Sequence, residues 1–171
     1  MSQGSGSGGD TAGPEPGESP KERVDRELIE LLNGLRVILP GVQVLLAFLL
    51  TVPFSSGYPK STSSERLLFF LTVLVTVGAV GALTMPAAYH RVRFREGDKE
   101  RMLLISNAFA VAGLVLLAVA TSMVVLLVTD VLYGMAVAVP VAVGVLALLA
   151  GTWFAVPLWR KILDEQERPS G

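Results

Sequence analysis

The sequence predicts an all-α fold: an integral membrane four-helix bundle preceded by a short amphipathic interfacial helix. Hydrophobic residues make up 51% of the 171-residue chain, and the mean hydropathy of +0.58 is above that of ordinary soluble domains. The apolar residues are also collected into long blocks with few or no charges, instead of being spread through amphipathic elements. This distribution is typical of helices that cross a bilayer.

Four blocks are long enough to cross a hydrocarbon core of about 30 Å, which takes roughly 20 apolar residues in a helix. Only the first block contains a charge, Arg36, and its long side chain can reach back to the headgroups. We therefore expect a four-transmembrane-helix domain at residues 35–159. Its spans are expected at about residues 35–54, 67–89, 102–127 and 133–159.

The segments on either side of this domain differ from it in composition. Residues 1–18 are rich in Gly, Ser and Pro and have too few apolar side chains to fold, so they predict a disordered tail. Residues 160–171 are polar and are expected to form a short cytoplasmic tail.

Residues 19–34 have apolar side chains at helical spacing and predict an amphipathic juxtamembrane helix that lies at the membrane surface. On its polar face, Glu22 and Arg26 are four residues apart, as are Arg26 and Glu30. Each pair can form an ion pair on the helix surface. Docking against the helix of a partner is the alternative role for this segment.

Positive charge predicts the orientation of the chain in the membrane. Twelve of the fourteen Lys and Arg residues lie on one predicted side: before or at the start of the first span, in the loop between the second and third spans, or after the fourth span. The other two, Lys60 and Arg66, lie between the first and second spans. Basic residues concentrate on the cytoplasmic side, so we expect a multi-pass protein with both termini cytoplasmic. Abundant Ala, Val and Gly, with more Arg than Lys, are compatible with a GC-rich bacterial genome, and we expect a bacterial plasma membrane as the location.

Basic residues near the predicted cytoplasmic surface are candidate anchors to anionic lipid headgroups, at about 1 kcal/mol each. His90, whose charge changes near neutral pH, can instead act as a pH sensor. A net charge of −1 argues against a nucleic-acid partner. The candidate anchors are Arg36, His90, Arg91, Arg93, Arg95, Arg160 and Lys161.

Small or polar residues recur at helical spacing within the spans, and in lipid such faces are expected to turn inward for close helix packing. The first span has Arg36, Pro40, Gln43, Ala47 and Thr51 on one face. The corresponding faces of the later spans are Gly78, Ala82 and Pro86, then Ser106, Ala110 and Gly113, and finally Pro140, Gly144, Ala147, Gly151 and Ala155.

Three residues within or beside the spans are candidates for chemistry. Gln43 and Asn107 are expected to be the most buried polar groups, forming hydrogen bonds between helices or lining a substrate path. Asp130 is the only acid between Glu100 and Asp164 and is the candidate ion-coupling residue. Its position predicts a solvated turn between the third and fourth spans as the alternative.

Motifs for enzyme chemistry are missing from the sequence. The chain has no cysteine and one histidine, and it has no glycine-rich phosphate loop or serine–histidine arrangement. We therefore expect no enzyme activity, no metal and no cofactor.

Three stretches occur together in a known family: Glu27–Arg36, Gly41–Gln43 followed by Leu45–Leu50, and Pro86–Arg91, with an asparagine near the start of the third span. In these, the chain resembles a family of small actinobacterial four-span membrane proteins classed as a domain of unknown function. Some relatives have the automatic label of sodium:proton antiporter. The resemblance extends from about Glu22 to Lys161 and implies a topology but no mechanism.

These observations favour a non-enzymatic structural, regulatory or accessory membrane component. Its expected partners are the lipid bilayer, anionic headgroups, and either further copies of itself or another membrane protein. The alternative is a small ion or proton-coupled transporter that uses Asp130, Gln43 and Asn107.

Overall fold

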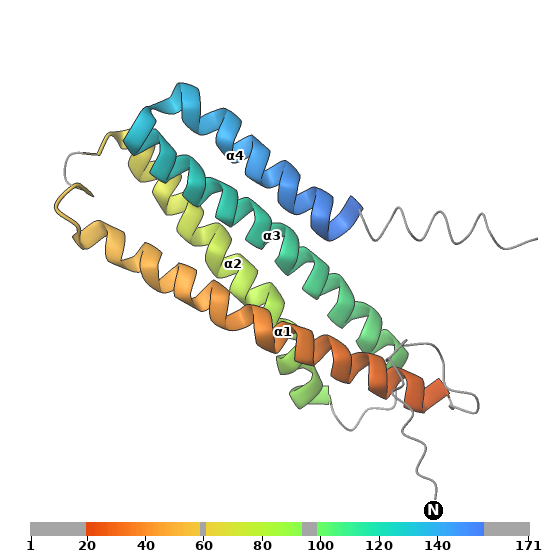
Figure 1. Ribbon diagram of the computed structural model, residues 1–171. Coiled ribbons are helices and arrows are strands. Elements are labelled where there is room, and N and C mark those ends of the chain that lie inside the picture. The colour runs from red at the N-terminus through yellow and green to blue at the C-terminus, as the bar shows by residue number, and fades with distance from the viewer. Residues whose placement is uncertain (1–19, 59–60, 94–98, 156–171) are drawn as a thin grey trace, which may run out of the picture.

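The computed structural model describes residues 20–58, 61–93 and 99–155. Within these ranges the chain is helical, without strands, and four of its helices are long and apolar enough to cross a membrane (Figure 1). The predicted tail at residues 1–18 and the predicted tail at residues 160–171 lie outside the described ranges.

The four long helices follow one another in an antiparallel, up-and-down order (Figure 1). We call the end where α1 joins α2 and α3 joins α4 the hairpin end. The opposite end, where α1 begins, α2 ends and α3 begins, is called the basic end. The elements are α1 (Pro20–Thr51), η1 (a 3-10 turn, Val52–Phe54), α2 (Ser63–Arg93), α3 (Lys99–Tyr133), α4 (Met135–Ala150) and η3 (a π-helical turn, Gly151–Ala155).

The structure gives no support to a separate amphipathic helix before the first span. Residues 20–34 are the first turns of α1, and they continue without a break into the part expected to cross the membrane (Figure 1). Leu28 and Leu35 are both buried on the same side of this helix. Because one apolar face runs through both parts, packing against the neighbouring helices favours a single rod.

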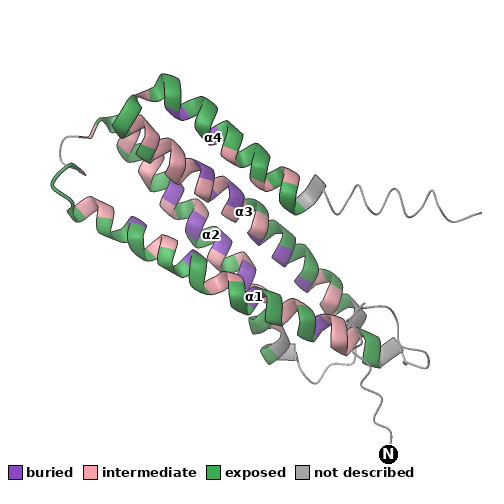
Figure 2. Ribbon diagram, in the orientation of Figure 1, coloured by how far each residue is buried: buried purple, intermediate pink, exposed green. Residues whose placement is uncertain are grey.

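The helices do not close into a four-helix bundle. α2 and α3 form the central pair, and α1 packs against both of them. Among the described residues, α4 packs against α3 but has no comparable contact with α1 or α2. Most of the surface of α1 and α4 is exposed as a result, while the buried positions gather along α2 and α3 (Figure 2).

α1 meets the central pair through large apolar side chains at a spacing of seven residues. Leu28, Leu35, Val42 and Leu49 are each 5% exposed or less. Leu35 and Val42 belong to one core cluster with Leu83 of α2 and Ala110 of α3. A repeat of seven keeps one side of a helix in contact with its neighbours over several turns.

The small residues predicted to turn inward do so on α3 but not on α1 or α4. Ser106, Ala110 and Gly113 are buried, so that part of the prediction is confirmed. The prediction is wrong for the stripe of small and polar residues on α1, because the leucine face of this helix packs inward and the stripe is turned to the outside. Every member of the α1 stripe is exposed: Arg36, Pro40, Gln43, Ala47 and Thr51.

The prediction that the small residues turn inward is also wrong for α4. Pro140, Gly144 and Ala147 are exposed, and the helix is buried at Ala138 and Ala142 instead. Since α4 touches α3 alone, one narrow face of two alanines is sufficient for the contact.

Candidate functional site

A cavity lies at the hairpin end, between α1 and the central pair. Its volume is about 540 Å³, and most of its walls are apolar side chains from α1, α2 and α3 and from the turn that joins α1 to α2. The ribbon of α1 separates from the ribbons of α2 and α3 towards this end (Figure 1). The lining residues are Phe48, Leu49, Val52, Gly57, Tyr58, Ser61, Glu65, Phe69, Val124, Leu127, Val128, Asp130, Val131 and Leu132.

The carboxylate of Glu65 is positioned by the start of α2. Its Oε2 accepts hydrogen bonds from the backbone N–H of Thr62 at 2.6 Å and from the Thr62 hydroxyl at 3.0 Å. The Thr62 Oγ1 in turn accepts a hydrogen bond from the Glu65 N–H at 3.3 Å. This is a capping box, and its signal, a threonine followed three residues later by a glutamate, was present in the sequence but was not used.

Aromatic contacts connect the turn to α2. The ring of Tyr58 meets that of Phe69 edge to face, with centroids 5.5 Å apart. The Arg66 guanidinium lies 5.9 Å from the centroid of the Tyr58 ring. An exposed cation–π contact of this kind stabilises by about 0.5–1 kcal/mol. Together with the capping box, these contacts fix one wall of the cavity.

Asp130 also lines the cavity, from α3. The expectation that it is a solvated turn residue is wrong in its local structure, because Asp130 belongs to the last turn of α3 and is half-buried. Its backbone carbonyl accepts a hydrogen bond from the Gly134 N–H at 2.8 Å. Its carboxylate has no hydrogen bond or ion pair with any described residue, and a negative charge near a helix C-terminus does not stabilise that helix.

Gln43 and Asn107 do not line this cavity. Both side chains are exposed on the outside of the helices, so the expectation that they are the most buried polar groups is wrong. Gln43 belongs to the outward stripe of α1, and Asn107 follows the buried Ser106 on α3. A role for either amide in contacts within the membrane remains a prediction.

The buried polar residues are hydroxyl side chains: Thr72, Thr76, Ser106 and Ser122. Of these, the sequence interpretation selected only Ser106, as a member of the inward stripe of α3. The hydroxyls of Thr76 and Ser122 donate to the carbonyls of Thr72 and Ala118, four residues earlier, each at 2.8 Å. This pairing satisfies them within their own helices. The Ser106 hydroxyl is buried without a hydrogen-bond partner.

The candidate headgroup anchors are only partly described. Arg36 and Arg91 are exposed. His90 and Arg93 belong to α2, but their side chains are outside the described part of the structure, and Arg95, Arg160 and Lys161 lie outside the described ranges altogether.

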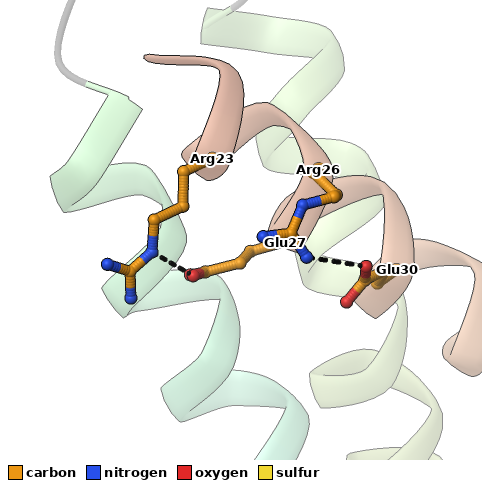
Figure 3. Close-up of polar contacts among 4 residues, drawn as sticks. All are labelled: Arg23, Arg26, Glu27 and Glu30. Carbon is orange, nitrogen blue, oxygen red and sulfur yellow. Dashed lines mark hydrogen bonds and ion pairs between the residues drawn. The ribbon is translucent and has the colours of Figure 1, made fainter. Parts of the chain in front are cut away.

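Two ion pairs lie along the first turns of α1 (Figure 3). Arg26 pairs with Glu30 at 3.2 Å, which confirms one of the predicted contacts. A second pair joins Arg23 and Glu27 at 2.8 Å and was not predicted (Figure 3). Both pairs join residues four positions apart, and each stabilises the helix by about 0.3–0.5 kcal/mol.

These features define a class: an all-helical chain with four helices that can cross a membrane, and with no group of His, Asp or Glu side chains within the described ranges that could hold a metal ion. The profile of a family of unknown function, DUF6328, matches residues 17–157. The chain therefore belongs to this family. No curated protein and no solved structure matches it.

Proposed function

We propose that the protein is a non-enzymatic, multi-pass component of the bacterial plasma membrane that acts by assembling with other copies of itself. The support for a membrane location is the large number of apolar side chains on the outside of the helices. Val37 is 80% exposed, Leu104 is 71% exposed and Val143 is 60% exposed. Apolar surface on this scale is unusual for a soluble monomer, and lipid tails would cover it.

The proposed orientation places both termini and the loop between α2 and α3 in the cytoplasm. Among the described residues, Arg23, Arg26, Arg91 and Arg101 belong to the basic end, and Arg66 belongs to the hairpin end. The positive-inside rule assigns the end with more Lys and Arg to the cytoplasm. At that surface, the candidate basic anchors would bind anionic headgroups.

Single cysteines test this orientation directly, because the natural chain has none. In intact cells, a membrane-impermeant maleimide is expected to label Ser56→Cys at the hairpin end and to leave Gly97→Cys unlabelled. Permeabilised cells supply the control, since both variants should then react. Labelling of Gly97→Cys in intact cells would show the reverse orientation.

The observation that supports assembly is the outward position of the α1 stripe. Gln43 presents a side-chain amide to the outside from within the apolar part of the helix, while the leucine face of α1 is already buried. An amide without a partner in hydrocarbon costs several kcal/mol. The small members of the stripe, such as Ala47, allow a second helix to approach closely.

A second copy of this chain is the partner that best fits the stripe. Subunits related by an axis along the membrane normal place equal residues at equal depth, so Gln43 would meet Gln43 of the other copy. A glutamine amide has both donors and an acceptor, and two of them can satisfy each other. No charged side chain of another protein is required for this contact.

Oxidative cross-linking in native membranes tests the proposed assembly. Ala47→Cys, within the stripe, is expected to form a covalent dimer. Gly41→Cys is the matched control, because Gly41 is also exposed on α1 but lies on another face of the helix. Equal cross-linking of the two variants would contradict the proposal, and cross-linking of Ala47→Cys to a different protein would identify an accessory role instead.

Ion or proton-coupled transport is the second candidate function. It is supported by the half-buried carboxylate of Asp130 at the cavity wall. Sodium or proton flux in proteoliposomes that is abolished by Asp130→Asn would establish this function. Absence of flux under both gradients would exclude it.

A further inference from the structure

The cavity at the hairpin end combines an apolar interior with negative charge. Apolar side chains such as Phe48, Phe69 and Val128 form most of its walls, and the carboxylates of Glu65 and Asp130 lie among its lining residues. With a volume of about 540 Å³, it lies in the range of small-molecule sites. Such sites typically have apolar walls with a few polar groups that orient the ligand.

The carboxylates of Glu65 and Asp130 differ in the hydrogen bonds that they make with the rest of the protein. Glu65 accepts two hydrogen bonds from Thr62 in the capping box and so has a structural role. The carboxylate of Asp130 has no hydrogen bond or ion pair among the described residues, although it is half-buried. It is therefore the group in this cavity that gains most from a ligand of opposite charge.

The occupant must match both the walls and this charge. A neutral acyl chain would fit the apolar walls but would cover Asp130 without pairing it. An anion of the same size would be repelled by both carboxylates. A lipophilic cation has an apolar body for the walls and a positive charge for Asp130.

We infer that the cavity between α1, α2 and α3 at the hairpin end is a binding site for lipophilic cations, with Asp130 as the charged contact. This inference goes beyond the proposed assembly through α1. Cross-linking at Ala47 tests the assembly, whereas ligand binding to the purified protein tests the site. Either proposal can therefore fail without the other.

Two ions of the same shape and opposite charge, tetraphenylphosphonium and tetraphenylborate, provide the test. Each is dialysed to equilibrium against the full-length protein in detergent, with detergent alone as the blank because both ions partition into micelles. Saturable retention of tetraphenylphosphonium above the blank, without such retention of tetraphenylborate, is expected. Equal retention of the two ions would overturn the inference.

Two variants and a control test whether tetraphenylphosphonium binds in the cavity. Asp130→Asn keeps the size of the side chain but removes its charge, and it is expected to weaken tetraphenylphosphonium binding by up to about fivefold, the upper end of the range for one partly exposed ion pair. Val128→Trp is expected to reduce binding by filling the cavity. Glu30→Gln, which removes a carboxylate on the exposed surface of α1, is the control and should bind like the natural protein.

An unchanged affinity in Asp130→Asn would contradict the inference. The elution profile of each variant shows whether it is folded. If Asp130→Asn does not fold, the comparison of the two ions on the natural protein and on Val128→Trp still decides the question.

Discussion

Gly134 separates α3 from α4 as a single residue. Its backbone has φ 82° and ψ 164°, a conformation that is essentially restricted to glycine, and its N–H donates to the carbonyl of Asp130 at 2.8 Å. Its carbonyl accepts hydrogen bonds from Val137 and Ala138 at the start of α4, each at 3.1 Å. Gly134 therefore ends α3 and precedes the first residue of α4. It also fixes the last turn of α3, to which Asp130 belongs.

Gly134→Ala is expected to lower the free energy of unfolding by about 1–3 kcal/mol, the cost of a side chain in this backbone region. The added methyl group would meet no atom within 4 Å, so the effect comes from the backbone alone. Thermal denaturation in detergent measures it. Gly57→Ala, at a turn glycine that also has open space around it, is the control and should change stability little.

At the scale of the helices, α2 and α3 approach each other closely at Gly113. A Cβ atom at this position would lie 2.6 Å from Cγ and 3.1 Å from the backbone N of Leu83, which is itself fully buried. The glycine is needed here because the neighbouring backbone cannot move away as a flexible side chain can. The contact holds together the central pair on which α1 and α4 pack.

Gly113→Ala is expected to destabilise the protein by about 1–3 kcal/mol, because overpacking outweighs the better helix propensity of alanine. Gly81→Ala provides a control of opposite sign. Gly81 is an exposed residue of α2 with open space around it, so the gain in helix propensity should stabilise the protein by up to about 1 kcal/mol. Chemical denaturation of both variants in the same detergent compares them, and destabilisation by both would show that the close contact is not the cause.

At the scale of the whole molecule, the helices leave most of α1 and α4 uncovered (Figure 2). The arrangement has α1 and α4 on the two sides of the central pair, each with a stripe of small residues turned outward. An open arrangement of this kind offers long surfaces to lipid and to further copies of the chain. This open arrangement is compatible with the proposed assembly of several copies.

Gln43→Leu is expected to weaken this assembly by about 3- to 30-fold, which corresponds to one hydrogen bond in a membrane worth about 0.6–2 kcal/mol. The fraction of dimer in detergent, measured by analytical ultracentrifugation, tests the expectation. Gly41→Ala, at an exposed position on another face of α1 with open space around it, is the control and should leave the fraction unchanged. Loss of monomer stability in Gln43→Leu with no change in dimer fraction would instead indicate an inward role for the amide.

The four helices able to cross a membrane could be predicted because each depends on a local property, the length of an uncharged apolar block. The separate amphipathic helix expected before them has no support, since residues 20–34 continue into α1. The direction in which each helix faces could not be predicted, since nearly every side of α4 is apolar and α1 has two faces that can pack. The sequence interpretation chose the small and polar face of α1, but Leu28, Leu35, Val42 and Leu49 bury more surface against α2 and α3. Gln43 and Asn107 were expected to be buried for the same reason, because the sequence does not show which face of a helix packs inward.

The candidate site was predicted only in part. Asp130 could be selected as the one acid in a long apolar region, and its location near the hairpin end followed from the order of the spans. The cavity itself could not be predicted, because its walls come from Phe48 of α1, Phe69 of α2 and Val128 of α3, which are far apart in the sequence. Only their packing brings these side chains around Asp130.

By itself, the sequence determined that this is an all-helical chain with four segments able to cross a membrane, because apolar length and missing charge are properties of continuous stretches. The tertiary structure decided that α2 and α3 form the centre, that α1 turns its leucines inward and its glutamine outward, and that Asp130 lies at a cavity. These features depend on which of several apolar faces bury the most surface together, and that competition is settled only when the helices pack.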